Sequence, residues 1–316
     1  MCPCGPRGLI SSTRVPGSTI SASVRRALWT FSTSAPTLAT TGAFQYPSFQ
    51  QAYARDLGVA EGRVRGWVAY MIMAGVLDRA AGADQPRFIV KGGVALELRL
   101  RDRARATKDI DVVLRDPTAG LADALEQALT GEPYQGFSFR RKGQPLLLDN
   151  GAVNLQVNVT YRGQPWTTIS VDIARAEAGE SDVEWVDAIA LTDAFGVSGP
   201  AQLPCLPLRY HVAQKLHGMT LPPRPGKQNE RFRDLVDLLL MEAMISQDYG
   251  ALREACELVF RSRATHAWPP SLDTTPAHWA KPYAQLAGDL ELAETDVELA
   301  LARLRTFVAR ILDVSS

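Results

Sequence analysis

The chain of 316 residues is long enough for one large domain or two smaller ones, and its 46% apolar content suits a globular core. Its 34 basic and 34 acidic residues balance, which excludes a general attraction to nucleic acid and leaves only local patches. The sequence contains no run of about 18 apolar residues, so we expect no membrane span.

Residues 1–45 differ from the rest of the chain in composition. They are rich in Ser, Thr, Pro and Gly and carry several Arg, and the first acidic residue is Asp56. Such a composition buries too little apolar surface to fold, so we expect a disordered extension. A basic, Ser-rich start without acids also resembles an organelle transit peptide. The alternative is an upstream extension with no folded role.

A stripe of apolar side chains follows at residues 64–77, with Val64, Val68 and Ile72 at helical spacing. This stripe predicts a helix that packs against the core. The wider segment 49–80 is also compatible with a DNA-binding helix-turn-helix, so two interpretations of the pattern remain.

The next part of the chain predicts an α/β unit. Short apolar or strictly alternating segments predict strands at 87–90, 109–114, 152–160 and 167–173. Helical stripes predict helices at 94–101 and 121–129.

The last third predicts helices at 207–218, 229–245, 250–261 and 290–312, with a connector rich in Pro and Trp at 266–282. We therefore expect the α/β (α+β) class, with a mixed-sheet catalytic domain at 46–200 and a helical domain at 201–316. The Pro-rich run 200–207 marks the boundary between them. The cysteines, Cys2, Cys4, Cys205 and Cys256, lie at no metal-ligand spacing, which indicates a reducing, cytoplasmic compartment and no structural zinc.

Asp109 and Asp111 are the first candidates for chemistry. Residues i and i+2 of a strand point the same way, so both carboxylates project from one face while Ile110 is buried on the other. Adjacent carboxylates repel each other, and a hard cation such as Mg²⁺ or Mn²⁺ relieves the repulsion. Alone, the pair is equally compatible with two solvated acids on an edge strand.

Lys91-Gly92-Gly93 stands between a predicted strand and a predicted helix. Glycines allow an anion to approach the backbone closely, and a helix N-terminus offers free N–H groups, so this turn predicts a cradle for a triphosphate. A plain tight turn is the alternative. The sequence of strand, glycine turn, helix and Asp109/Asp111 strand is more specific than either part, because it places the cradle beside a metal site.

Asp172 lies on the polar face of the strand predicted at 167–173. If that strand neighbours the Asp109/Asp111 strand, three carboxylates can hold two metal ions, as in two-metal phosphoryl-transfer sites. Asp172 would then lie nearest the acceptor hydroxyl and help to remove its proton. The alternative is a surface aspartate.

These motifs resemble a known family. Val90 to Leu96 (VKGGVAL) and Arg105 to Val112 (RATKDIDV) are similar to the signature of the AbiEii/AbiGii nucleotidyltransferase toxins, with Val94 at a position that is usually Thr. The resemblance implies the fold of the DNA polymerase β-type nucleotidyltransferases. It also implies that Thr107 contacts the nucleotide.

The resemblance continues through the helical part and covers roughly residues 64–312. Residues 208–216 are similar to the family's lysine-bearing helix, which implies that Lys215 is required and binds the triphosphate. Residues 231–238 (RFRDLVDL) are similar to its R-x-K-D-x-x-D-L motif, with Arg233 in place of Lys. Arg231 and Asp234 are three residues apart on one helix face, where Asp234 can hold Lys215 or the ribose. The alternative is an ordinary surface Lys215, with Arg231 and Asp234 on a solvated helix face that carries local ion pairs.

The resemblance implies a metal-dependent, toxin-like enzyme of a toxin–antitoxin or phage-defence pair. It implies NTP as substrate, Mg²⁺ or Mn²⁺ as cofactor, an antitoxin as partner and the 3′ end of a tRNA as acceptor. The basic segment 99–105 is a candidate for contacting acceptor phosphates. Nucleotidylation of a protein or small molecule, and a catalytically inactive nucleotide- or partner-binding protein, are the alternatives.

Overall fold

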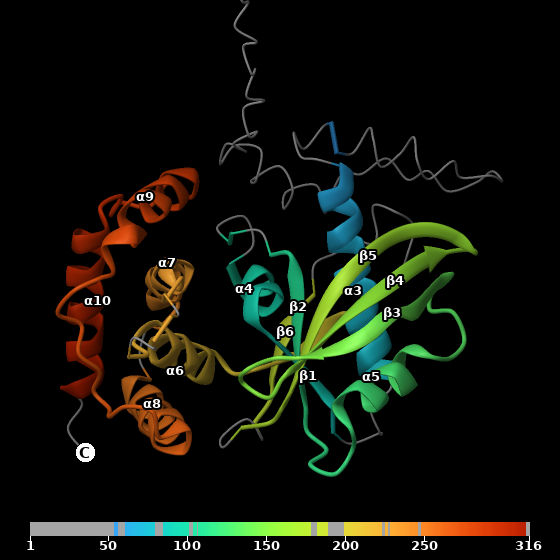
Figure 1. The fold of residues 1–316 in the computed structure, drawn as a ribbon, viewed down its shortest axis with the longest axis horizontal. Coiled ribbons are helices and arrows are strands. Elements are labelled where there is room, and N and C mark those ends of the chain that lie inside the picture. Colours follow the sequence, from blue (N-terminus) through green and yellow to red (C-terminus); the bar gives the residue numbers. More distant parts are fainter. Residues whose placement is uncertain are drawn as a thin grey trace, which may run out of the picture.

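The protein consists of a seven-stranded sheet beside a group of C-terminal helices (Figure 1). This computed structural model describes residues 54–55, 61–79, 85–100, 104–105, 107–177, 182–188, 199–222, 225–226, 228–245 and 248–313. The predictions for residues 1–45, and for the first part of a helix-turn-helix before residue 61, lie outside the described residues.

The sheet has the strand order β3-β4-β5-β2-β1-β7-β6. Two pairs of neighbours, β2 with β5 and β1 with β7, are parallel, and the other pairs are antiparallel. The mixed sheet agrees with the predicted fold class. Its strands are β1 (Phe88–Lys91), β2 (Asp109–Leu114), β3 (Phe137–Leu147), β4 (Val153–Tyr161), β5 (Gln164–Arg175), β6 (Glu184–Asp187) and β7 (Gln202–Cys205).

Helices α3 (Glu61–Arg79) and α5 (Leu121–Leu129) cover one face of the sheet. The α3 stripe predicted from Val64, Val68 and Ile72 is fully buried in the core between these helices and the sheet. This burial favours the core-helix interpretation, because a DNA-reading helix must keep a face free for the groove.

The other core lies among the C-terminal helices, which Figure 1 shows beside the sheet. Trp279, Tyr283, Phe260 and Phe307 are its largest fully buried aromatic side chains, and Leu96 and Leu100 pack against it from the sheet side. The helices are α4 (Gly92–Leu100), which follows β1, and α6 (Leu208–Met219), α7 (Phe232–Glu242), α8 (Tyr249–Arg263), η4 (Ala277–Trp279), α9 (Ala280–Asp289) and α10 (Val297–Leu312).

Strands β3, β6 and β7 and helix α9 were not predicted. The last lies partly in the expected connector 266–282, and β7 lies in the Pro-rich run taken as a boundary. Pro204 is tolerated in β7 because β1 pairs with this strand at a single register position, Val90 with Cys205, so few ladder hydrogen bonds need its missing N–H. None of the described helices is long and apolar enough to cross a membrane.

Candidate active site

A row of four polar side chains crosses the sheet on the face opposite α3 and α5. Asp111 on β2 is the register partner of Asp172 on the parallel strand β5 and of Lys91 on the antiparallel strand β1. Asn154 on β4 continues the row beyond Asp172. We call Lys91, Asp111, Asp172 and Asn154 the carboxylate row. Asp109 lies two residues before Asp111, on the same face.

Burial raises the proton affinity of Asp109 and Asp111, and repulsion from neighbouring carboxylates adds to the effect. The pKa of Asp109 is raised by burial and by repulsion from Asp172, against a hydrogen bond from Ser170. The pKa of Asp111 is also raised, first by loss of solvent, although the charge of Lys91 opposes the shift. Such mutual repulsion is the electrostatic signature of a place that gains from a bound cation.

Asp109, Asp111 and Asp172 are the candidate ligands for a divalent metal ion. Three carboxylates on one sheet face are the hard oxygen donors that such ions prefer. Among the described residues, however, no group of three or more His, Cys, Asp and Glu side chains converges at metal-ligating geometry. Asp172 instead accepts a hydrogen bond from Asn154 Nδ2 at 2.5 Å. The carboxylate oxygens are therefore suitable ligands for a cation, but the carboxylates would have to rotate to coordinate one ion together.

The glycine turn between β1 and α4 is shaped by close packing. Gly92 has a φ of +62°, and a Cβ at this position would lie 1.8 Å from Asp111 Oδ2. A Cβ on Gly93 would lie 2.3 Å from Thr107 Oγ1. Both positions therefore require glycine, because the side chains of Asp111 and Thr107 lie too close for a Cβ atom. The carboxylate of Asp111 lies against the first turn of α4, where the helix dipole favours an anion.

Thr107 belongs to a loop that leads into β2 and is fixed at several points. Its backbone N–H donates to Glu97 Oε1 of α4 at 3.0 Å, and its hydroxyl donates to the carbonyl oxygen of Asp109. Tyr70 of α3 donates to the carbonyl oxygen of Lys108. The start of β2, and with it Asp109, is thus held from α3 and α4 together.

Lys215 lies buried on α6 between two carboxylates of α7. Its Nζ donates to Asp234 Oδ1 at 2.7 Å and to Asp237 Oδ2 at 2.8 Å, so the predicted contact with Asp234 is present. Burial lowers the pKa of Lys215, but the two carboxylates outweigh burial, and the net pKa is raised. Lys215 is therefore a fixed cation, and its charge also favours the ionised form of Asp111.

Arg231 and Asp234 lie on one face of the α7 region, as predicted from their spacing. Arg231 Nη1 donates to Asp234 Oδ2 at 2.9 Å, and the Arg231 side chain remains 53% exposed. The pKa of Asp234 is lowered to about 2, because Lys215 and Arg231 outweigh the effect of burial. Asp234 thus stays ionised and links the buried Lys215 to an exposed guanidinium.

Asp237, for which no role was predicted, is fully buried. It accepts hydrogen bonds from Lys215 and, at 3.0 Å each, from Nε and Nη2 of Arg105. These contacts join the loop before β2 to α6 and α7. Its position three residues after Asp234, on the same helix face, is the signal that could have identified it.

The prediction that segment 99–105 contacts acceptor phosphates fails for its two described arginines. Arg99 is 3% exposed in its side chain, pairs with Glu184 and donates to the carbonyl oxygen of Leu206 at 2.7 Å. Arg105 is committed to Asp237. Both guanidiniums join parts of the protein to one another, because each is a rigid, multi-donor group that satisfies several buried acceptors at once.

His211 is buried one helical turn before Lys215. Among the described residues, neither of its ring nitrogens has a hydrogen-bond partner. Its pKa lies well below the ordinary value, first because of burial and then because of the nearby charges of Lys215 and Arg99. The imidazole is therefore neutral and adds no charge to the site.

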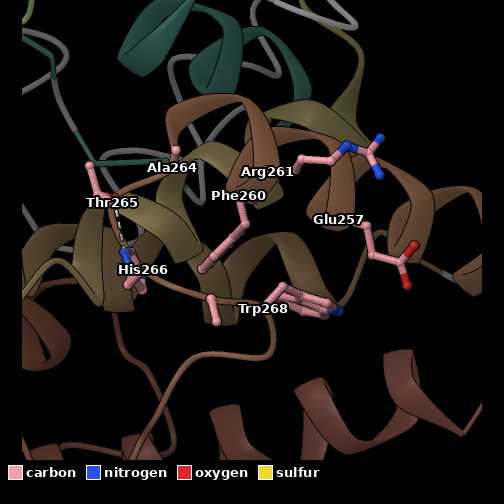
Figure 2. Close-up of a pocket in the computed structure, with 8 residues that line it drawn as sticks. Glu257, Phe260, Arg261, Ala264, Thr265, His266 and Trp268 are labelled. Atoms are coloured by element: carbon pink, nitrogen blue, oxygen red, sulfur yellow. Dashed lines mark hydrogen bonds between the residues drawn. The ribbon is translucent and has the colours of Figure 1, made fainter.

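A pocket of about 530 Å³ lies away from the carboxylate row, at the end of α8. Figure 2 shows the lining residues Phe260 and Trp268, whose rings lie close together, and the hydrogen bond between Thr265 and His266. None of the predicted site residues lines this pocket. The candidate active site is therefore the polar sheet face and not this hollow.

The chain is similar to known proteins in sequence and in fold. A family model described as "Nucleotidyl transferase AbiEii toxin, Type IV TA system" matches residues 75–310. Among solved structures, the nucleotidyltransferase toxin MenT4 (Rv2826c) from Mycobacterium tuberculosis H37Rv is similar, with a TM-score of 0.59 and 21% identity over 84% of this chain and 90% of its own. The antibiotic-resistance factor ANT(2'')-Ia matches with a TM-score of 0.34 and 16% identity over 62% of this chain and 91% of its own. No curated protein sequence matches significantly.

Proposed function

The chain belongs to the AbiEii nucleotidyltransferase toxin family, and on this premise we propose that it transfers a nucleoside monophosphate from an NTP to the 3′ end of an RNA, specifically a tRNA. The observation that carries the proposal is the register of Asp111 with Asp172 and Lys91. This register sets two carboxylates and a cation side by side on one face of the sheet.

In the proposed reaction, the acceptor 3′-hydroxyl attacks the α-phosphorus of the NTP. A new oxygen–phosphorus bond forms, the bond between the α-phosphorus and the bridging oxygen breaks, and pyrophosphate leaves. The proton of the hydroxyl passes to the carboxylate of Asp172, which Asn154 holds by its 2.5 Å hydrogen bond. Lys91, beside Asp111 at the start of α4, contacts the phosphates together with the N–H groups of Gly92 and Gly93.

Asp109, Asp111 and Asp172 would hold Mg²⁺ or Mn²⁺. When bound, the metal would neutralise the triphosphate and stabilise the attacking and leaving oxygens. The raised pKa values of Asp109 and Asp111 support this assignment, because burial and neighbouring carboxylates raise them and a bound cation would oppose both effects.

Lys215 is proposed to stabilise the charge that develops on the triphosphate. An ammonium has three N–H donors, and Asp234 and Asp237 take two of them in the described residues. The remaining donor is available to a phosphate oxygen. We propose that Arg231, which is exposed and anchored by Asp234, contacts the nucleotide from the helical side, and that Thr107 does so from the loop before β2.

The biological role that we propose follows the family. The enzyme would act as a cytoplasmic toxin that blocks tRNA by extending it, would be neutralised by a cognate antitoxin protein, and would serve in phage defence. The neighbouring reading frame offers a direct check, since an adjacent antitoxin gene is expected.

The decisive experiment uses NTPs labelled at the α- or the γ-phosphate, with purified tRNA, total RNA and total protein as separate acceptors. We expect α-label, and no γ-label, to enter RNA of tRNA length in a reaction that requires divalent metal. Asp111→Asn should abolish this transfer. Label that enters only protein would contradict the RNA assignment and support the alternative of protein nucleotidylation.

An inactive binding protein is the remaining alternative. In that case, Asp109→Ala and Asp111→Ala would leave toxicity on induced expression unchanged. Loss of toxicity in both variants, with unchanged protein levels, would support catalysis.

A further inference from the structure

Strands β3, β4 and β5 have one face that no described helix covers. The other face of these strands packs against α3 and α5, and the C-terminal helices and α4 lie beside β1, β2 and β7 instead (Figure 1). Side chains on the open face are exposed or half-buried, whereas their neighbours along each strand are buried. The carboxylate row therefore lies where a covered part of the sheet becomes an open one.

The open face is polar and, away from the active-site aspartates, carries no acid. Amide and hydroxyl side chains alternate across β4 and β5 and bond to one another, as in Asn154 to Ser170 at 2.7 Å and Thr168 to Asn158 at 2.9 Å. We call this surface the polar ledge; its members are Asn154, Gln156, Asn158, Thr160, Thr168 and Ser170. Such groups are donors and acceptors for base edges and ribose hydroxyls.

Two cations stand at the far edge of the ledge, on β3. Arg140 is in register with Asn158, and Lys142 is in register with Gln156. Both are exposed, and neither has a carboxylate partner among the described residues. Arg141, between them, points to the opposite face, where it pairs with Glu126 at 3.0 Å. The alternation thus places two unpaired charges on the ledge side and one paired charge on the covered side.

We propose that the polar ledge binds the single-stranded 3′ end of the acceptor polynucleotide, with Arg140 and Lys142 contacting its phosphates. The proposal rests on the proposed transfer to RNA. Strand β3 lies three strand spacings from β2, which is about 14 Å. A strand of nucleic acid that contacts both cations can therefore extend across the amides and hydroxyls, and its terminal hydroxyl then reaches Asp172.

Charge favours a polynucleotide over an acidic protein segment on this surface. An acidic peptide would bring further carboxylates toward Asp109, Asp111 and Asp172, and carboxylates this close repel one another. A polynucleotide spaces its charges along its backbone and presents neutral bases and hydroxyls to a neutral surface. The ledge offers such a surface between two positive positions at its edge and the reacting aspartates.

The test measures the binding of a short single-stranded RNA that carries a 5′ fluorophore and a free 3′-hydroxyl. Its affinity is determined from fluorescence anisotropy, without NTP and at several salt concentrations. The variant is Arg140→Gln/Lys142→Gln. Its matched control is Arg261→Gln/Lys281→Gln, which removes two exposed cations of the helical half that form no ion pair with any other described residue. Urea unfolding should show both variants folded, because surface changes of this kind alter stability little.

We expect the Arg140/Lys142 variant to bind the RNA about tenfold more weakly at moderate salt, and the control to bind as the wild type does. The slope of log affinity against log salt should fall by about 1.4, because each lost phosphate contact on a single strand contributes about 0.7. Equal affinity and slope in the wild type and the Arg140/Lys142 variant would overturn the proposal. So would unchanged RNA binding with loss of binding to the cognate antitoxin.

The same measurements separate this proposal from the proposed function. If the wild type transfers no label to RNA but the variant still loses RNA binding, the ledge is supported and the transfer reaction is refuted. If the wild type labels tRNA and the variant binds and labels it equally well, the reaction is supported and the ledge is refuted.

Discussion

Removing the charge of Asp237 should destabilise the protein more than removing any exposed charge. This carboxylate has no exposed surface and accepts hydrogen bonds from three nitrogen atoms of cations, Nζ of Lys215 and Nε and Nη2 of Arg105. Asp237→Asn preserves the shape of the side chain, but it removes the negative charge and turns an N–H₂ group toward a cationic donor.

The magnitude follows from the contacts. Breaking a buried ion pair from one side costs about 3–5 kcal/mol, because the partner charge stays buried without compensation. Lys215 keeps its 2.7 Å bond to Asp234, and the Arg105 side chain is 20% exposed and gains water. We therefore expect the lower end of the range, a loss of about 3 kcal/mol, from a total that is typically about 5–15 kcal/mol.

Urea unfolding of the wild type and Asp237→Asn measures this loss as a shift of the midpoint at constant slope. Glu257→Gln is the control, since it breaks the half-exposed pair with Arg253 within one helix and should cost less than about 1 kcal/mol. Lys215→Met combined with Asp237→Asn should be less destabilised than the sum of the two single changes, because each removes the other's uncompensated partner. A loss below about 1 kcal/mol in Asp237→Asn would refute the reasoning.

Three further predictions concern the carboxylate row and its support. Gly92→Ala should lower label transfer about 100-fold, because its Cβ displaces Asp111; unchanged activity contradicts this packing. Asn154→Ala should lower transfer about 10–100-fold with an altered pH profile, because Asp172 loses its donor. The pKa of Asp234 is lowered from 3.8 to about 2, which contributes about 2 kcal/mol to the free energy of unfolding. This contribution is present above pH 4 and is lost as the pH falls to 2. The urea midpoint of the wild type should therefore fall over this pH range by more than that of Asp234→Asn.

Local patterns in the sequence predicted the strands and helices that carry one buried face. The strand predicted at 109–114 and the helix predicted at 121–129 match β2 and α5 in both bounds, because alternation and a helical stripe are complete within each segment. The pairing of Lys215 with Asp234 was also accessible, since the family motifs place both on helices.

Register and long-range partners could not be read from the sequence. The contact of Asn154 with Asp172 depends on how β4 aligns with β5, and Arg105 meets Asp237 across 132 positions of the chain. Strand β3 was missed because only its first half alternates in burial, and its remaining side chains are largely exposed. Arg99 and Arg105 looked like a basic patch, since a charge pattern alone does not tell which carboxylates lie nearby.

The position of β7 ties the two parts of the chain into one folding unit. This strand lies inside the sheet, pairs with β1 and β6, and leads within a few residues into α6, which carries Lys215. A fragment that ends at residue 200 would leave the edge of β1 unpaired, and the complementary fragment would begin with a strand that lacks its neighbours. The two pieces thus have complementary open edges, which makes this junction a natural place to divide the enzyme into inactive halves whose association restores it.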